Sequence, residues 1–284
     1  MSASTQQEVD CEVSRQKGVH KAKAWTMKIA TSFMAVGTLA CLSCLAQSKN
    51  PAEHVPDIPV KLDKMPESLE NRFALSAIPS HLREGATTYV LDPAKGYVLS
   101  HQGTNGISCI VVRSDWQWAD SPFRDDIFWP VCYDAEGSKT LLQDYIYAAE
   151  LRARGMNAKQ VYDEVTKRFG TAAYPNPSRS GVSYMIAPLM RGYTHGPVPA
   201  TMNMPHYMFY APNVKNKDLG GNSFGQYPFI LSMNPGRDDY IILLVGESEK
   251  AKILLESNDL LADLCSYRDY LCTTDATRAR TPIN

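Results

Sequence analysis

Short alternating runs of apolar and polar residues dominate the first part of the chain after residue 85 and predict β-strands. These runs are 86–91, 96–100, 107–112 and 128–133, which are rich in β-branched and aromatic residues and separated by turn residues. The dipeptide Asn105-Gly106 is a strong turn signal, because both residues tolerate a positive φ. It predicts that 96–100 and 107–112 are partner strands.

Cys109 and Cys132 lie on two of these runs and predict a disulfide. If they face each other in an antiparallel pair, Val111 faces Pro130 and a long loop joins the strands. Because Pro130 has no N–H for the ladder, we expect its strand to be a sheet edge or to carry a bulge. Such a bridge would restrict the unfolded chain by about 3 kcal/mol. Two separately buried thiols are the alternative.

After residue 137 the apolar period changes from two to about 3.6, which predicts helices. The later expected elements are helices at 141–151, 157–169 and 250–264 and strands at 182–188, 206–212 and 240–246, the last of them buried. The two central helices would form a helical hairpin on an apolar sheet. The predicted fold class is therefore α+β, with an antiparallel sheet built on a disulfide-linked β-hairpin and the helical hairpin on one face.

The apolar run 29–46 follows the basic start Met27-Lys28 and predicts a secretory signal peptide that is cleaved after Ala46. Either Met1 begins a long basic region or Met27 is the true start, and the sequence favours the second. A retained membrane anchor is one alternative. Lipid attachment at Cys41 or Cys44 is another. The expected organisation is an N-terminal extension and signal peptide at 1–46, a Pro-rich linker at 47–85, one domain at 86–264 and a flexible tail at 265–284.

Removal of the signal peptide leaves four cysteines, Cys109, Cys132, Cys265 and Cys272. An even number in an exported chain suggests disulfides, and of the three possible connectivities we favour 109–132 with 265–272. The expected location is the periplasm or the extracellular space.

The overall composition does not alter these predictions. The 284 residues are 44% apolar and 21% charged with a formal net charge of -1, which is ordinary for a globular protein. No basic stripe is present, so a nucleic-acid partner is not expected. Membrane contact is expected only through the signal segment or a lipid anchor.

Four motifs in order form a recognisable set: 103–109 (GTNGISC), 132–137 (CYDAEG), 181–185 (GVSYM) and 205–212 (PHYMFYAP). The set resembles a group of exported bacterial proteins of unknown function, which share GTNG-x-x-C, Cys-x-Asp, Tyr-Met and Pro-His-x-Met elements. The resemblance covers about 86–246 and implies export, but no activity, cofactor or catalytic residue.

His206 and Asp134 are the candidate catalytic pair. A histidine titrates near neutral pH and an aspartate can orient it, so a pocket that held both with Arg179 or Tyr184 could perform acid–base chemistry. The alternative is that His206 is a hydrogen-bonded structural residue and Asp134 caps a turn.

A metal site would draw on His101, His195, His206 and Asp134, but no metal-binding spacing joins them. No metal is therefore predicted. The chain also lacks a phosphate-binding loop, a dinucleotide fingerprint and a nucleophile elbow, so no cofactor is predicted.

The loop 114–129 is the candidate binding surface, because it carries Trp116 and Trp118 among several aspartates. Indoles beside carboxylates can hold a sugar or a protein partner. The alternative is that aromatic side chains pin the loop to its own domain. The leading function is a non-catalytic or ligand-binding envelope protein, whose partner is a small ligand, a glycan or an envelope protein. A hydrolase-like enzyme that uses the His/Asp pair is the alternative function.

Overall fold

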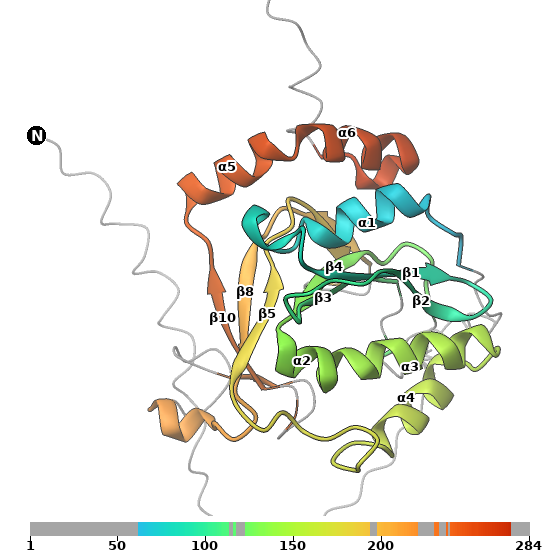
Figure 1. Ribbon diagram of the computed structural model, residues 1–284, viewed down its shortest axis with the longest axis vertical. Coiled ribbons are helices and arrows are strands. Elements are labelled where there is room, and N and C mark those ends of the chain that lie inside the picture. The colour runs from blue at the N-terminus through green and yellow to red at the C-terminus, as the bar shows by residue number, and fades with distance from the viewer. Residues whose placement is uncertain are drawn as a thin grey trace, which may run out of the picture. The chain divides into compact units, whose positions relative to one another are not determined.

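The computed structural model describes residues 62–113, 116–117, 123–193, 198–220, 230–232, 237 and 239–273. All of these residues belong to one compact unit, Glu53–Asn284 (Figure 1). The predicted signal segment at 29–46 and most of the predicted linker lie outside the described residues.

The unit combines helices with one large sheet. The helices are α1 (Glu67–Leu75), η2 (Ser80–Leu82), α2 (Ala135–Lys139), α3 (Leu141–Ala153), α4 (Ala158–Thr166), η3 (Asn216–Leu219), α5 (Glu247–Glu256), α6 (Asn258–Tyr267) and η4 (Asp269–Leu271). The strands are β1 (Thr87–Asp92), β2 (Gly96–His101), β3 (Ser108–Val112), β4 (Trp129–Tyr133), β5 (Gly181–Met185), β6 (Met190–Gly192), β7 (Ala200–Met202), β8 (His206–Tyr210), β9 (Leu231–Ser232) and β10 (Asp239–Leu244).

The main sheet has the strand order β2-β1-β3-β4-β5-β8-β10-β9. All neighbouring strands are antiparallel except β1 and β3, which are parallel. β6 and β7 form a separate two-stranded sheet. The α+β class with a mostly antiparallel sheet agrees with the sequence prediction.

Both cysteine pairs are at disulfide distance. β3 and β4 pair antiparallel, and their register places Cys109 opposite Cys132 and Val111 opposite Pro130. Cys265 pairs with Cys272 at the end of α6. The structure thus has the connectivity that the sequence favoured.

The partner predicted for β3 is wrong. β2 pairs with β1 through the turn after Asp92, whereas β3 lies on the other side of β1 and runs parallel to it. Asn105-Gly106 does form a turn, and Gly106 has a positive φ of 79°. The turn docks on the preceding loop instead, because the Asn105 side chain donates to the Leu82 carbonyl at 2.9 Å and the Asn105 backbone N–H donates to the Gly85 carbonyl at 3.0 Å. The chain therefore crosses the end of β1, and β3 pairs with β1 on the side away from β2.

Pro130 is not on an edge strand, contrary to expectation. β4 lies between β3 and β5. The neighbouring strand β5 pairs only with Cys132 and Tyr133 of β4, so the sheet needs no N–H from Pro130 on that side. The proline is tolerated in this strand because β5 ends before the position opposite Pro130.

Strand β10 is buried only in its first half, whereas the sequence predicts a buried strand. Tyr240 is buried, but Leu243 is 55% and Leu244 60% exposed.

Helices cover both faces of the central strands (Figure 1). On one face, α1 and α6 contribute Phe73 and Leu264 to a core that includes both strand cysteines. On the other face, Leu141 and Leu142 of α3 pack on alternate residues of β3 and β4. α4 packs on α3, and the Asn157 side chain accepts the Gln160 N–H as its N-cap.

The folded domain is wider than predicted at both ends. Residues 62–85 are not a linker, because Met65, Phe73 and Ile78 are completely buried in the core. Residues 265–273 are not a free tail either, since Leu271 of η4 is buried against the same core. The sequence indicates a short helix within 69–82 that is broken at Pro79, and α1 and η2 lie there. It does not show that this segment packs in the core, because each segment is short and bounded by prolines or polar residues.

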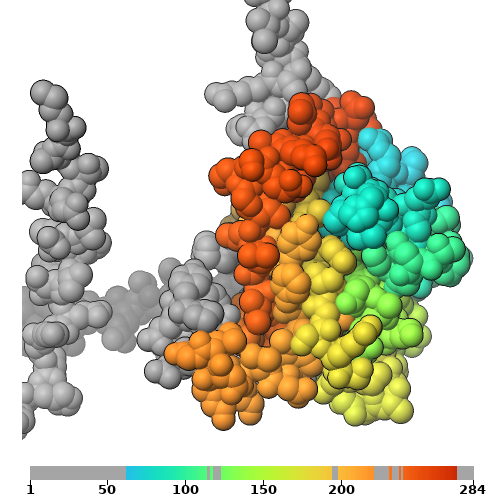
Figure 2. All heavy atoms as spheres, turned by 60° about the vertical axis from the view of Figure 1, so that its left-hand side comes forward, coloured from blue at the N-terminus to red at the C-terminus, as the bar shows by residue number. Residues whose placement is uncertain are grey.

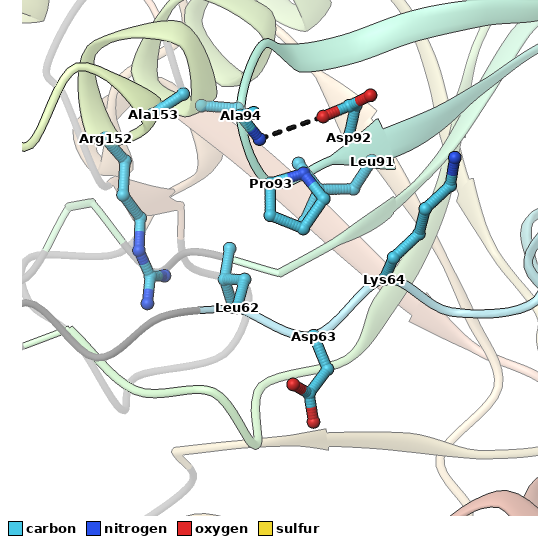
Figure 3. A pocket seen from close by; sticks show the side chains of 10 residues that line it. Leu62, Asp63, Lys64, Leu91, Asp92, Pro93, Ala94, Arg152 and Ala153 are labelled. Carbon is cyan, nitrogen blue, oxygen red and sulfur yellow. Dashed lines mark hydrogen bonds between the residues drawn. The ribbon is translucent and has the colours of Figure 1, made fainter.

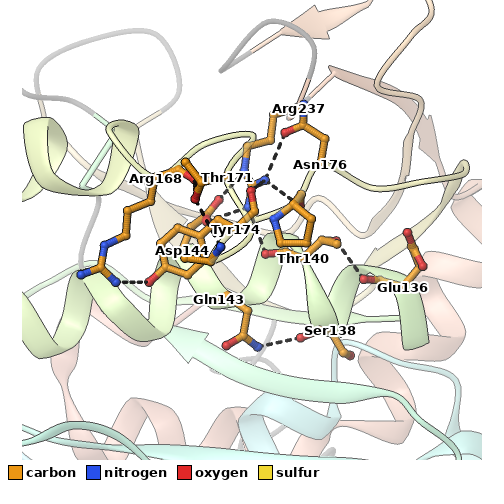
Figure 4. Close-up of polar contacts among 12 residues, drawn as sticks. Glu136, Ser138, Thr140, Gln143, Asp144, Arg168, Thr171, Tyr174, Asn176 and Arg237 are labelled. Atoms are coloured by element: carbon orange, nitrogen blue, oxygen red, sulfur yellow. Dashed lines mark hydrogen bonds and ion pairs between the residues drawn. The ribbon is translucent and has the colours of Figure 1, made fainter.

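Arg237 joins the loop before β10 to helix α3 (Figure 4). Its Nε and Nη2 donate to the two carboxylate oxygens of Asp144 at 2.9 and 2.7 Å, and Nη1 donates to the carbonyls of Tyr174 and Pro175. Both partners of this ion pair are buried. A buried pair that is so completely hydrogen-bonded fixes β10 relative to the helical layer, and removal of one partner would leave an uncompensated charge.

None of the helices in the described ranges has the length and apolar character needed to cross a bilayer.

We expect the two disulfides to contribute unequally to stability. The Cys109–Cys132 bridge closes a sequence separation of 23 residues and the Cys265–Cys272 bridge one of 7. The double variant Cys109→Ala/Cys132→Ala should lose about 3 kcal/mol of unfolding free energy, and Cys265→Ala/Cys272→Ala about 2 kcal/mol, because the loss grows with loop length. Urea unfolding of both variants measures the difference. A larger loss in the second variant would contradict this order.

Candidate functional site

His206 and Asp134 lie at opposite ends of strand β8. In the register of β5 and β8, Tyr210 lies beside Gly181 and His206 lies beside Met185. His206 and Tyr210 are four residues apart on β8, which corresponds to a distance of about 13 Å along the strand. Asp134 is at the Tyr210 end, where it accepts the Tyr210 hydroxyl and the Val182 N–H. The predicted catalytic pair is therefore not assembled.

Each member of that pair has a structural role. Asp134 accepts the Gly137 N–H at 2.9 Å and caps α2. His206 is buried, and its Nδ1 is 2.7 Å from the Met204 carbonyl. Burial lowers the pKa of His206, which favours the neutral ring.

The other predicted binding residues are dispersed. Trp116 is only 1% exposed and packs edge-on against Tyr145 and Phe169, so it pins its loop to the helical layer. Trp118 lies outside the described residues. Arg179 is exposed in the loop before β5, and Tyr184 is half-buried on β5 beside Tyr207. The Trp116 side chain is therefore not available as the predicted contact surface.

The histidines do not gather into a metal site within the ranges that the structure describes. No group of three or more His, Cys, Asp or Glu side chains able to hold a metal ion occurs there. His101 is exposed at the end of β2, and His195 lies outside these ranges.

A cavity of about 660 Å³ lies among the described residues beside helix α3 (Figure 3). It opens between the segment at 62–64, the turn that joins β1 to β2, and the last turns of α3. Its apolar lining is formed by Leu62, Leu91, Pro93, Ala94, Ala149 and Ala153. The volume is within the range of about 300–1,000 Å³ that is usual for small-molecule sites.

The charged groups of this cavity are two bases and two acids, and the acids are engaged. Asp63 forms an ion pair with Arg268. The Asp92 carboxylate accepts the Ala94 N–H at 2.9 Å inside its own turn (Figure 3). Lys64 makes no ion pair with any described residue.

Arg152 reaches the cavity from α3 and is held in a fixed position. Its guanidinium donates to the carbonyls of Arg113 and Arg124 at 3.2 and 2.9 Å and lies 4.4 Å from the centre of the Phe123 ring. Burial, and then the like charge of Arg113, lower the pKa of Arg152 to about 10. Arg152 is therefore a half-buried cation that is held in place at the wall of the cavity.

A buried polar cluster lies next to this cavity. The Arg113 side chain is 1% exposed and stacks 4.0 Å from the centre of the Phe128 ring, while its Nε and Nη1 have no hydrogen-bond partner among the described residues. Glu70 on α1 accepts the Leu91 N–H through Oε1 at 2.9 Å, and its buried Oε2 is also without a partner there. Buried polar groups normally have partners, so these atoms mark an unusual interior.

The electrostatic balance of this cluster is visible in Glu70. Burial raises the pKa of the Glu70 carboxyl to about 7, and the hydrogen bond from Leu91 and the charge of Arg113 only partly oppose this. The charges of Arg113 and Lys64 lower the pKa of Glu70 and that of Glu67 raises it, but burial is the largest influence. Sequence patterns gave no sign of this cluster, because Glu70 falls in the segment taken for a linker.

Comparison with protein families, with curated proteins and with solved structures finds no match for this chain. The site must be interpreted from its own geometry.

Glu70 should make the protein less stable as the pH rises. Because the folded state holds the Glu70 proton up to about pH 7 and the unfolded chain releases it near pH 4, this stabilisation is complete below about pH 4 and is lost as the pH rises through 7. The free energy of unfolding that is lost between about pH 4 and pH 7 is about 3 kcal/mol. The variant Glu70→Gln, which keeps an acceptor for Leu91, should not show this loss.

Urea unfolding of both proteins between pH 4.5 and 8 measures the effect as a difference, which cancels the other titrating groups. Glu84→Gln, an exposed change outside the cluster, is the matched control and should follow the wild type. Parallel pH profiles for the wild type and Glu70→Gln would show that Glu70 titrates normally.

Proposed function

We propose that this chain is an exported ligand-binding protein, and that its cavity between α3 and the β1–β2 turn holds a small anionic molecule with an apolar body. The observation that carries the proposal is the combination of an apolar lining with Lys64 and Arg152 in one cavity of ligand size. A few convergent polar groups on an apolar surface are typical of small-molecule sites.

The charge of the ligand follows from the groups that line the cavity. Asp63 and Asp92 are already bound to Arg268 and to the Ala94 backbone, so they are poor partners for a cation. Arg152 is held in place at the cavity wall by the carbonyls of Arg113 and Arg124. A carboxylate, sulfonate or phosphate could pair with Lys64 and Arg152 while its apolar part covered Leu62 and Leu91.

Export is supported by the two cysteine pairs at disulfide distance, because disulfides persist mainly in oxidising compartments. The same proposal includes the signal peptide at 29–46. The hydrolase alternative receives no support from the geometry, since His206 and Asp134 occupy opposite ends of β8.

Octanoate should bind in this cavity, and octylamine, which has the same chain length and the opposite charge, should not. Lys64→Glu should weaken octanoate binding about tenfold, because it replaces an attraction of up to about 1 kcal/mol by a repulsion. Isothermal titration calorimetry measures both ligands.

Lys95→Glu is the matched control. Lys95 is exposed in the β1–β2 turn and does not line the cavity. The substitution Lys95→Glu changes the net charge by the same amount as Lys64→Glu. Equal affinity for octanoate and octylamine, or an equal effect of both lysine substitutions, would contradict the proposed site.

A further inference from the structure

The two ends of the described fold meet beside the cavity. Segment 62–64 lines the cavity and precedes α1, whereas η4 follows α6. The Arg268 guanidinium, just before η4, donates to the Asp63 carboxylate and forms an ion pair with it. Met65 and Leu271 are buried in the same core. Figure 2 shows the C-terminal helices (red) next to the N-terminal part of the described fold (blue to cyan). One wall of the cavity is therefore supported by η4 and the residue before it.

The Cys265–Cys272 disulfide restrains this support. η4 is a single turn, Asp269–Leu271, in which the Leu271 N–H donates to the Arg268 carbonyl at 2.9 Å. A turn of this length has too few hydrogen bonds to be stable alone. The bridge spans a sequence separation of 7 residues, and Arg268 and Leu271 both lie inside the loop that it closes. It therefore restrains both the residue that pairs with Asp63 and the residue that fills the core.

Other contacts would keep η4 partly ordered if this bridge were opened. The Thr201 hydroxyl donates to the Tyr270 carbonyl, and the Arg191 guanidinium lies 4.8 Å from the centre of the Tyr270 ring. We therefore expect opening of the bridge to loosen the wall of the cavity without unfolding the domain.

The two disulfides differ in their access to a reductant. Cys109 and Cys132 are completely buried in the core, whereas Cys265 and Cys272 both keep part of their surface exposed. Thiol–disulfide exchange begins when a thiolate reaches one of the two sulfurs, so access limits its rate. Exposed disulfides are the ones that act as labile or regulatory bonds in folded proteins. A dithiol should therefore reduce the bridge at η4 and leave the central one intact.

We propose that the Cys265–Cys272 disulfide is a redox switch for ligand binding in the cavity beside α3. In the oxidised protein, η4 and Arg268 hold segment 62–64 in place and the cavity is formed. In the protein reduced at this bridge, η4 loosens and the affinity for the ligand falls. This inference rests on the proposed function of the cavity as a site for small anions with an apolar body.

The switching reaction is a two-electron reduction by a dithiol. One thiolate of the dithiol attacks a sulfur of the bridge, which breaks the Cys265–Cys272 bond and forms a mixed disulfide with the reductant. The second thiolate of the dithiol attacks this mixed disulfide, and the reductant leaves as its own disulfide. Two electrons and two protons pass to the protein, which then carries two thiols.

The first experiment tests the switch without a ligand. Dithiothreitol should reduce the bridge in the folded, exported protein, so that iodoacetamide labels Cys265 and Cys272 but neither Cys109 nor Cys132 in peptide mass spectra. After this reduction the η4 amides of 269–272 should exchange their hydrogens about tenfold faster. The amides of α4 are the internal control and should exchange as before. Equal labelling of all four cysteines, or unchanged exchange at 269–272, would overturn the proposal.

The second experiment measures octanoate binding by titration calorimetry in both redox states. Octanoate should bind the reduced protein about fivefold more weakly, because only part of that population keeps segment 62–64 in place. Cys265→Ser/Cys272→Ser should bind like the reduced protein and should not respond to dithiothreitol. Thermal unfolding shows that this variant is folded.

Linkage requires the reverse effect as well. Saturating octanoate should make the bridge harder to reduce by the same factor, which is about 20 mV for a fivefold change in a two-electron couple. Octylamine should leave the reduction potential unchanged.

The outcomes separate this inference from the proposed function. An oxidised protein that binds octanoate with the affinity of the reduced protein would overturn the switch and leave the proposed function standing. An oxidised protein that does not bind octanoate would overturn the proposed function, and this inference with it.

Discussion

The antiparallel pairing of β3 with β4 is the interaction on which both layers of this fold depend. These strands are central in the sheet, and their alternate residues face different cores. Cys109 and Cys132 contact the core of α1 and α6, whereas Ile110 and Val131 contact the core of α3. A one-residue slip in this pair would exchange the two faces of one strand, and the disulfide allows no such slip. The register of these two central strands is therefore fixed.

The sequence predicted the elements of the sheet better than their neighbours. β1, β3, β4, β5 and β8 were expected within a few residues, because turn residues and β-branched runs are local signals. Which strand lies beside which is decided by long-range contacts. The Asn105 turn shows this, since its hydrogen bonds to Leu82 and Gly85 send β3 past β1 instead of back along β2. No local pattern contains that information.

The candidate site was not predictable for a related reason. The cavity takes Lys64 from the segment before α1, Pro93 from a turn and Arg152 from α3, and each residue alone looks like an ordinary surface or helix residue. The predictions for His206, Asp134 and Trp116 followed residue type, which indicates what a side chain can do but not whether it has already found a structural partner. Asp134 has three such partners, and burial in an aromatic cluster occupies Trp116. Residue type alone is a weak predictor of catalytic function for polar side chains that can also hydrogen-bond to backbone groups.

The two disulfides have different places in this fold, which makes their effects separable. The Cys109–Cys132 bridge lies in the core between the central strands, whereas the Cys265–Cys272 bridge lies at the end of α6, beside the wall of the cavity. Only the second is joined to the cavity, through the ion pair of Arg268 with Asp63. Substitutions that share no partner and lie far apart usually have additive effects. A domain whose central strands are cross-linked can therefore loosen one wall of a ligand cavity and keep its fold.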